Sequence, residues 1–499
     1  MKLVYIPLDE RPCNYHFAEK IARGTPIELR RPAREILGNK KTPADFSRLR
    51  AFMLENASRA DGYVVSLDML LYGGIVPSRL HHLSREELTQ RLAVLDEIKA
   101  INPDVKIYGF ALIMRCPRYS SADEEPSYYE HCGREIFLTG QVKHKQELGL
   151  LEQPQAQALL EQYAAVTGDA LSDYERRRQV NRQMLLEIIE KLHSSIDYLV
   201  IPQDDSAQYG YTTMDREAIK AEIRRKGLED VAMYPGADEV GMTLTARAAC
   251  EYMNRTPKIY CDFTREEARQ LTPLYEDRPV GLTLPYQIDT AGCACVSRAE
   301  EADIHLFLNY PTAQQLEVWE ASELKNDRRN LDAFTDRMTA SVRAGRVTAL
   351  ADGGFCNGGD EALMLLVENK LGVLNLSAYA GWNTSSNTLG TVICQAVFVF
   401  LFGDSREQKC FLAERICEDV GYCGHVRKYV TDCVLPEMNL NYFDAGSVEG
   451  DVSKRVREEL ENYLKEKFPP ISERYSISHC AMPWKRMFEV ELSMKERAQ

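Results

Sequence analysis

Two patterns of hydrophobic and polar positions alternate along the chain. Short apolar runs rich in β-branched residues are followed by longer segments in which apolar residues recur every three or four positions. The short runs predict β-strands at Leu3–Pro7, Gly62–Leu67, Val105–Met114, Tyr198–Pro202, Val231–Tyr234, Lys258–Cys261, Ile304–Leu308, Val347–Ala351 and Leu374–Tyr379. The longer segments predict helices at Arg85–Ile101, Asp173–Leu192, Met214–Lys226, Met242–Met253 and Asp360–Lys370. Strands that alternate with helices predict an α/β fold with parallel sheets.

The length of the chain predicts more than one hydrophobic core. It has 499 residues, whereas single cores stop growing at about 250–300 residues. We predict an α/β domain at 1–255, whose sheet is either open or closed into a TIM-like barrel, and a second α/β domain at 256–404. A helix-rich region at 405–499 would end in a strand-like segment, Ala481–Met494. The polar, Tyr-rich segment Ser120–Gln141 predicts an irregular insertion or lid.

The loops that follow the predicted strands carry most of the candidate chemistry. In parallel sheets, ligands bind beyond the carboxyl ends of the strands. Carboxylates, amides and glycines are concentrated in six such loops, at 8–14, 66–74, 203–210, 234–241, 352–361 and 380–388. Single residues in them have a structural explanation, since Asp, Asn and Ser cap helices, and we expect Asp360 to be an N-cap. Capping needs only one acceptor per helix, so the loops taken together predict one polar pocket.

A sugar is the substrate class that such a pocket favours. Carboxylates and amides hydrogen-bond hydroxyl groups, and an aromatic face such as that of Trp382 can stack on a sugar ring. Glycoside hydrolysis uses two carboxyl groups in different roles, and neighbouring carboxylates raise one another's proton affinity. We therefore predict a glycoside hydrolase. Its predicted catalytic residues are Asp238 and Glu239, followed by Asp204 and Asp205. Its predicted substrate-binding residues are Asp9, Arg11, Asp68, Arg115, Asp352, Trp382, Asn383 and Asn387.

Two other functions stay open at this point. Asp9, Asp68, Asp204, Asp205, Asp238 and Asp352 are oxygen donors that suit Mg²⁺, Mn²⁺ or Ca²⁺, so a metal-dependent hydrolase is one alternative. The other is a non-catalytic protein that binds a sugar or a small metabolite. Arg11, Arg79 and Arg115 follow predicted strands closely, and they would either recognise an acidic group or neutralise the aspartates around them. We expect no cofactor and no metal in the leading interpretation.

Composition narrows the partners and the compartment. A net charge of −14 argues against a nucleic-acid partner, because phosphate binding needs a basic face. The fourteen cysteines are scattered without C-x-x-C pairs, and the closest spacing is Cys293 and Cys295, which fits a reducing cytoplasm. The longest apolar stretch, Val392 to Phe402, is too short to span a bilayer. We predict a cytoplasmic protein with a small-molecule or oligosaccharide substrate and no membrane partner, and its oligomeric state stays open.

One loop resembles a known catalytic signature. Gly236-Ala237-Asp238-Glu239-Val240 is similar to the Gly-Gly-Asp-Glu-Val signature of β-N-acetylhexosaminidases. The resemblance implies that Asp238 orients the acetamido group of the substrate and that Glu239 is the general acid/base. The loop departs from the signature at Ala237, and no histidine precedes it. The pair Asp204-Asp205 is similar to the paired aspartates of other substrate-assisted hexosaminidases.

The chain as a whole resembles an uncharacterised bacterial family, a domain of unknown function. Three segments carry this resemblance, namely Pro7–Pro12 with the sequence PLDERP, Tyr379–Thr384 with YAGWNT and Pro483–Arg486 with PWKR. The resemblance implies membership and supplies no activity.

Overall fold

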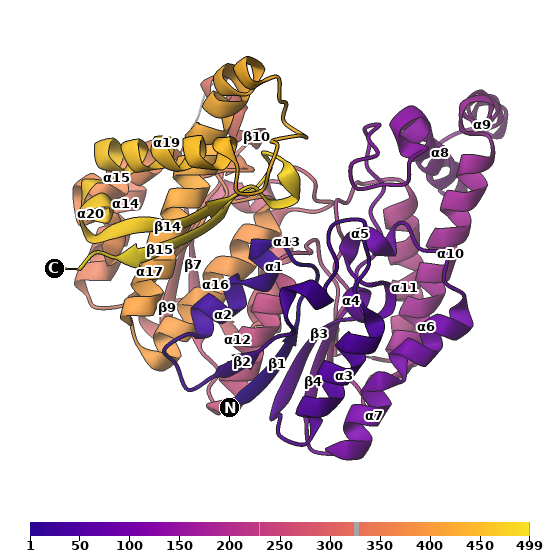
Figure 1. Ribbon diagram of the computed structural model, residues 1–499, viewed down its shortest axis with the longest axis horizontal. Coiled ribbons are helices and arrows are strands. Elements are labelled where there is room, and N and C mark those ends of the chain that lie inside the picture. The colour runs from indigo at the N-terminus through magenta and orange to yellow at the C-terminus, as the bar shows by residue number, and fades with distance from the viewer. Residues whose placement is uncertain (229, 324–328, 499) are drawn as a thin grey trace. The chain divides into compact units, whose positions relative to one another are not determined.

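The computed structural model describes residues 1–228, 230–323 and 329–498 (Figure 1). The chain divides into two compact units. Unit 1 comprises Met1–Glu10, Leu29–Gly241 and Tyr275–Asp277, and unit 2 comprises Arg11–Glu28, Met242–Leu274 and Arg278–Gln499. Each unit contains a parallel sheet with helices, which confirms the predicted α/β class. The boundaries 1–255, 256–404 and 405–499 stay a prediction.

Unit 1 is built on a six-stranded sheet in the order β2-β1-β3-β4-β5-β6 (Figure 1). Its strands are β1 (Lys2–Ile6), β2 (Glu28–Arg30), β3 (Gly62–Ser66), β4 (Lys106–Phe110), β5 (Tyr198–Val200) and β6 (Val231–Ala232). From β1 to β6 every pairing is parallel. All five residues of β3 are buried, as expected for a strand with helices on both faces. Edge strands β2 and β6 leave the sheet open, so the part of unit 1 that the structure describes contains no closed barrel.

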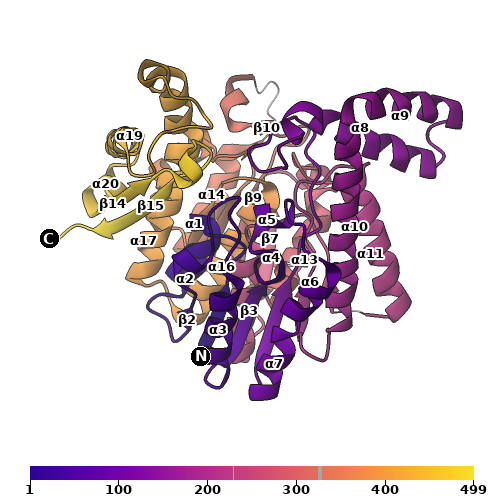
Figure 2. The same cartoon turned by 45° about the vertical axis from the view of Figure 1, so that its right-hand side comes forward.

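The helices of unit 1 confirm most of the predicted segments. They are α3 (Phe46–Ala57), α4 (Leu67–Tyr72), α5 (Ile75–Ser78), α6 (Arg85–Leu92), α7 (Val94–Ile101), α8 (Tyr129–Glu147), α9 (Gln153–Thr167), α10 (Asp169–Glu190) and α11 (Tyr211–Lys226). A capping box between Ser84 and Glu87 begins α6, and the predicted single helix Arg85–Ile101 is two helices that meet at Ala93. The predicted irregular segment Ser120–Gln141 is wrong from Tyr129 onward, because α8 begins there and packs against α9 as a hairpin (Figure 2).

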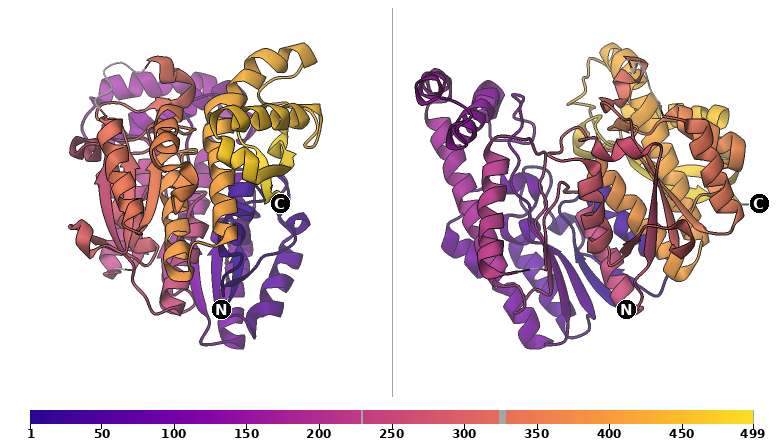
Figure 3. Two further views of the ribbon diagram at one scale, coloured as in Figure 1. Left: turned by 90° about the vertical axis from the view of Figure 1, so that its left-hand side faces the viewer. Right: turned by 180° about the vertical axis from the view of Figure 1, so that it is seen from behind.

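Unit 2 contains a five-stranded parallel sheet in the order β13-β11-β9-β7-β8 (Figure 3). Its strands are β7 (Lys258–Phe263), β8 (Ala294–Val296), β9 (Ile304–Asn309), β11 (Val347–Asp352) and β13 (Ala378–Ala380). In both units the second strand lies outside the first, and the third, fourth and fifth strands follow on the other side. This is the order of doubly wound sheets, which bind ligands at their carboxyl edge.

The remaining elements of unit 2 cover this sheet and extend it. The helices are α1 (Pro12–Tyr15), α2 (Phe17–Ala22), α12 (Val240–Tyr252, which begins in unit 1), α13 (Val280–Thr290), α14 (Leu331–Arg343), α15 (Glu361–Leu371), α16 (Ser385–Phe402), α17 (Arg406–Arg415), a π-helix (Ile416–Val426), α18 (Arg427–Tyr429), a second π-helical segment (Val430–Val434), α19 (Asp451–Lys467) and α20 (Pro469–Arg474). The short strands are β10 (Leu316–Glu317), β12 (Phe355–Cys356), β14 (Tyr475–Ala481) and β15 (Glu491–Glu496). The predicted strand-like end of the chain is thus an antiparallel hairpin of β14 and β15.

The core of unit 2 includes one unusually apolar helix. Among the described residues, α16 alone is long and apolar enough to cross a membrane, and 83% of this helix is buried inside the protein. It packs against β11 and β13, which is the environment of a core helix. Seven short 3-10 turns complete the described structure, at Arg34–Ile36, Glu266–Gln270, Ala299–Glu301, Val318–Glu323, Val373–Asn375, Pro436–Met438 and Pro483–Lys485.

Candidate functional site

The carboxyl edge of the unit 1 sheet gathers polar loops from five strands. Because β1, β3, β4, β5 and β6 are parallel, the loops that follow them leave from the same edge. The predicted site residues on these loops are Asp9, Arg115, Asp204, Asp205, Asp238 and Glu239, with Asp68 in the helix directly after β3. Isolated bridges from Gln203 to Ile113 and to Pro235 extend the pairing beyond the strands and hold the last three loops together.

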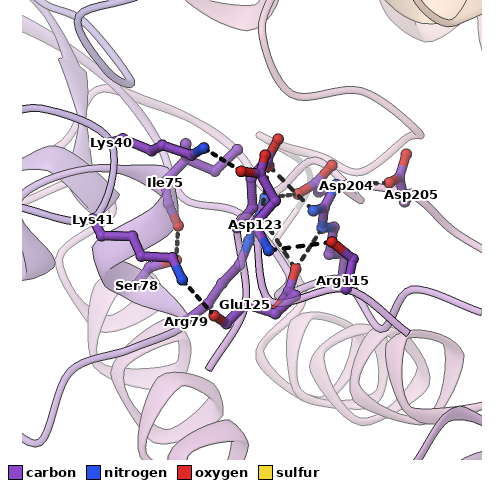
Figure 4. A network of polar contacts seen from close by, with 12 residues as sticks. Lys40, Lys41, Ile75, Ser78, Arg79, Arg115, Asp123, Glu125, Asp204 and Asp205 are labelled. Carbon is purple, nitrogen blue, oxygen red and sulfur yellow. Dashed lines mark hydrogen bonds and ion pairs between the residues drawn. The ribbon is translucent and has the colours of Figure 1, made fainter. Parts of the chain in front are cut away.

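Arg79 is the centre of a buried ion-pair network at this edge (Figure 4). Its guanidinium donates to Glu124 Oε2 at 3.0 Å, to Glu125 Oε1 at 3.3 Å and to Asp204 Oδ2 at 2.7 Å. Arg79 and Glu125 are each only 1% exposed. A buried charge of either sign is costly unless it is paired, so these contacts hold the Asp204 side chain in place.

Arg115 repeats this arrangement on the next loop. It donates to Glu125 Oε1 at 2.8 Å, to Glu124 Oε2 at 3.1 Å and to Asp205 Oδ2 at 3.0 Å (Figure 4). Two guanidinium groups therefore face four carboxylates. This favours neutralisation of the acidic groups as the role of both arginines, and it disfavours an acidic ligand. Glu124 and Glu125 come from the polar segment after β4, and the run of acidic residues there was their only sequence signal.

Asp68 is a buried carboxyl group in the first turn of α4. Ser66 Oγ accepts from Met69 N at 3.1 Å and so caps the helix directly after β3. Asp68 Oδ2 accepts from Leu112 N at 2.8 Å. Burial raises the pKa of Asp68 to about 7, and the charge of Asp204 adds to this, although the bond from Leu112 opposes it. Asp68 can therefore hold a proton near neutral pH.

Asp205 is the most accessible carboxylate of the network. Its side chain is 28% exposed, and its backbone has a φ of +29°, which is uncommon for a residue other than glycine. Burial and the neighbouring charge of Asp204 raise the pKa of Asp205 to about 6. Strained backbone of this kind is frequent at functional sites.

The loop that carries Asp238 and Glu239 folds back on itself. Glu239 is completely buried, and its Oε2 accepts from Ala237 N at 3.0 Å. Gly236 has a φ of +149°, and a Cβ there would collide with the Glu239 carboxyl group. Asp238 is also buried. This packing explains the glycine, and for Glu239 it favours holding the loop over contact with a substrate.

The loop after β1 is tied to the same edge. Glu10 Oε1 accepts from Lys40 N at 2.7 Å, and the Lys40 side chain forms an ion pair with Asp123 (Figure 4). Asp9 is 2% exposed. Asp9 is therefore packed inside the protein next to this edge.

Asp352 ends β11 and lies in the interior of unit 2. Its Oδ1 accepts from Asn309 Nδ2 at 2.7 Å, and its Oδ2 accepts from Asp360 N at 2.7 Å and from the Tyr379 hydroxyl at 3.0 Å. Burial and the charge of Asp360 raise the pKa of Asp352 to about 6. Asp360 Oδ1 accepts from two backbone N–H groups at the start of α15, which confirms its predicted role as an N-cap.

Asp419 is a buried carboxyl group that the loop-based interpretation missed. It lies in the π-helix, where Arg415 Nη1 donates to its Oδ1 at 3.0 Å and Gly381 N donates to its Oδ2 at 2.8 Å. Burial raises the pKa of Asp419 to about 7. No sequence signal identified it, because it follows a helical pattern rather than a strand.

Five segments of the chain line a small hollow in unit 2. They are the start of α1, the loop after β12, the loop after β13, the π-helix with the start of α18, and the residues before β15. The lining residues are Pro12, Cys13, Asn357, Trp382, Asn383, Glu418, Cys423, Arg427, Phe488, Glu489 and Val490. Trp382 and Asn383 thus meet there as predicted site residues. The Trp382 indole donates to Thr391 Oγ1 at 3.1 Å and packs edge-on against Phe17.

The other two predicted residues of unit 2 are packed inside it. Arg11 lies over the Trp484 ring at 4.8 Å, and Arg486 lies over the same ring at 4.5 Å. Asn387 is buried in α16. The contacts of Arg11 join two of the segments that carry the family resemblance, PLDERP and PWKR.

The positions of the candidate metal ligands bear on the alternative of a metal-dependent hydrolase. Within residues 1–228, 230–323 and 329–498, no group of three or more His, Cys, Asp or Glu side chains is placed to hold a metal ion. The predicted oxygen donors Asp204 and Asp205 instead face arginines.

Comparisons with known proteins identify the family. No curated protein and no solved structure matches the chain. The family model described as "Protein of unknown function (DUF4127)" matches residues 3–493, which is nearly the whole chain. The protein therefore belongs to the DUF4127 family.

Proposed function

We propose that the protein is a hydrolase that cleaves glycosidic bonds at the carboxyl edge of the unit 1 sheet. One observation carries the proposal. Asp68, whose pKa is raised to about 7, lies within electrostatic reach of Asp204, which accepts a hydrogen bond from Arg79. Environments that separate two carboxyl groups into a proton donor and an anion supply the two roles that glycoside hydrolysis requires.

Each carboxyl group has a distinct part in the proposed reaction. Asp68 donates its proton to the oxygen of the leaving group as the glycosidic C–O bond breaks. Water then adds to the anomeric carbon and returns a proton to Asp68. Asp205, the more exposed carboxylate, faces the sugar together with Asp204 and stabilises the positive charge that develops on the ring. Arg79 and Arg115 keep these carboxylates in place, as the contacts in Figure 4 indicate.

The charge balance of the edge supports a neutral or cationic sugar as the substrate. Carboxylates outnumber guanidinium groups there, so an acidic sugar would be repelled. N-acetylhexosaminides are neutral and fit this requirement. The hexosaminidase resemblance assigns the acid role to Glu239 and the orienting role to Asp238. That assignment stays a prediction, and the hydrogen bond that Glu239 accepts from Ala237 N gives it a role in holding its own loop.

The compartment and the partner follow from the same proposal. All fourteen cysteines are free thiols, which supports action in a reducing cytoplasm. The partner would be a small glycoside or an oligosaccharide.

A screen of chromogenic glycosides, including N-acetylhexosaminides, with and without a chelator tests the function. We expect hydrolysis that the chelator does not change. Asp68→Asn keeps the size of the side chain but removes the acid, and it should lower kcat by about 10²–10⁴-fold. Asp419→Asn is the matched control, because Asp419 is also fully buried and its pKa is also raised to about 7.

The possible outcomes separate the proposed function from its alternatives. A near-normal kcat in Asp68→Asn, or an equal loss per folded molecule in Asp419→Asn, would contradict the role of Asp68. Cleavage of another substrate class that a chelator abolishes would support a metal-dependent hydrolase. Sugar binding without turnover would support a binding protein.

A further inference from the structure

Two cysteines lie on neighbouring strands at the edge of the unit 2 sheet. β8 is an edge strand whose one neighbour in the sheet is β7, and Cys295 pairs in register with Ile259. Alternate residues of a strand share a face, so Cys261 lies on the same face as Ile259 and Cys295. The two thiols are therefore diagonal neighbours on adjacent strands.

The two thiols have very different environments. Cys295 is exposed, whereas Cys261 is buried. The neighbouring Cys261 thiol lowers the pKa of Cys295 to about 6, and the Arg269 guanidinium lowers it further although burial opposes this. The Cys295 sulfur and burial raise the pKa of Cys261 well above its usual value. The accessible sulfur is therefore the more acidic of the two.

We infer that Cys295 and Cys261 form a peroxide-reactive pair, in which Cys295 is the oxidation site and Cys261 is the resolving thiol. The Cys295 thiolate attacks one oxygen of hydrogen peroxide, the O–O bond breaks, and the released hydroxide takes up a proton to become water. Cys295 is then a sulfenic acid. The Cys261 sulfur loses its proton and attacks the Cys295 sulfur, the S–O bond breaks, and a second water leaves. Two thiols are oxidised to one disulfide while one peroxide is reduced to two waters.

The position of β8 makes the second step possible. Diagonal neighbours on adjacent strands have Cα atoms roughly 7–8 Å apart, slightly more than the about 4.4–6.8 Å that disulfides span. β8 has only three residues and a single neighbouring strand in the sheet. A small shift of this edge strand would close the gap without disturbing the central strands.

Peptide mapping of the full-length protein after treatment with hydrogen peroxide tests the pair. We expect a disulfide between the peptides that contain Cys261 and Cys295, reversible by a thiol reductant. Cys295→Ser should abolish it, and Cys261→Ser should leave a sulfenic acid at Cys295 that dimedone traps. Cys433→Ser is the matched control, because Cys433 is the other exposed cysteine, and it should not change the cross-link.

Alkylation rates give a second readout that needs no variant. At pH 7, iodoacetamide should modify Cys295 about tenfold faster than Cys433, since the thiolate is the nucleophile. Peroxide oxidation that never links Cys261 to Cys295 in the wild-type protein would overturn the inference. Alkylation of Cys295 no faster than that of Cys433 would overturn it as well.

Discussion

The two sheets share a strand order but use their carboxyl edges differently. In unit 1 the edge carries carboxylates that face guanidinium groups, and Asp205 is partly exposed. In unit 2 the corresponding edge holds Asp352, which is completely buried and accepts from an amide, a backbone N–H and a hydroxyl. The same topology thus places acidic groups at the same edge. Their partners determine whether such a group fixes the fold or stays available for chemistry.

The difference lies in what compensates for burial. A carboxylate that receives several hydrogen bonds is stabilised in place, and Asp352 has no further capacity for a ligand once its neighbours have donated to it. Burial and a neighbouring charge raise the pKa of both groups, to about 6 for Asp352 and to about 7 for Asp68, and Asp68 receives fewer hydrogen bonds that oppose this rise. Asp68 can therefore donate its proton to a substrate. In contrast, breaking the hydrogen bonds of Asp352 would lower the stability of the fold.

Removal of the central guanidinium of unit 1 should have the largest effect on stability. Arg79→Met removes the guanidinium that pairs with Glu124, Glu125 and Asp204. Arg115 still pairs with both glutamates, but Asp204 loses its ion pair with Arg79, and we expect the free energy of unfolding to fall by about 3–5 kcal/mol. Urea denaturation measures this. The control is Arg337→Met, since Arg337 is 43% exposed and pairs with Asp262, and exposed pairs contribute less than about 1 kcal/mol. Equally small losses in the free energy of unfolding of both variants would show that the ion pairs of Arg79 are not buried.

Replacement of Asp352 should have a smaller effect on stability. In Asp352→Asn the new amide would point a donor at groups that themselves donate, such as Asn309 and Tyr379. We expect a loss of about 1–3 kcal/mol in urea denaturation, the cost of unsatisfied buried groups. An unchanged midpoint and slope would mean that the carboxylate is not fixed as the structure shows.

Replacement of Glu239 should have the smallest effect. Glu239→Gln keeps an oxygen that can accept from Ala237 N, and we expect kcat to change by less than about tenfold. The acid/base role implied by the hexosaminidase resemblance requires a loss of about 10²–10⁴-fold. Steady-state kinetics on the preferred glycoside would distinguish the two, and a loss in the larger range would move the acid role from Asp68 to Glu239.

Much of the fold could be predicted from periodicity, whereas the weakest elements could not. Every predicted strand overlaps an observed one, although Leu374–Tyr379 overlaps β13 only at its end because Val373–Asn375 form a 3-10 turn. The strands β2 and β8 escaped because their residues are exposed or half-buried, so neither strand is a buried apolar run. The break at Ala93 escaped because the apolar positions continue through it.

The candidate site was predictable only as a set of loops. Strand ends indicated where Asp68, Asp204 and Asp205 would lie. The protonation of Asp68 depends on burial and on a neighbouring charge, and the position of the Asp204 side chain depends on Arg79. These are contacts between residues far apart in sequence, so no local pattern reports them.

The pH dependence of unfolding tests most directly whether Asp68 holds a proton. Its pKa is 3.8 in the unfolded chain and about 7 in the fold, so between these values the folded state binds more protons and stability falls as pH rises. The free energies of unfolding of the wild type and Asp68→Asn should be compared from about pH 4 to about pH 8. We predict that the wild type loses up to about 4 kcal/mol relative to the variant between pH 4 and pH 7, and little above that. A difference that stays constant over this range would contradict the account.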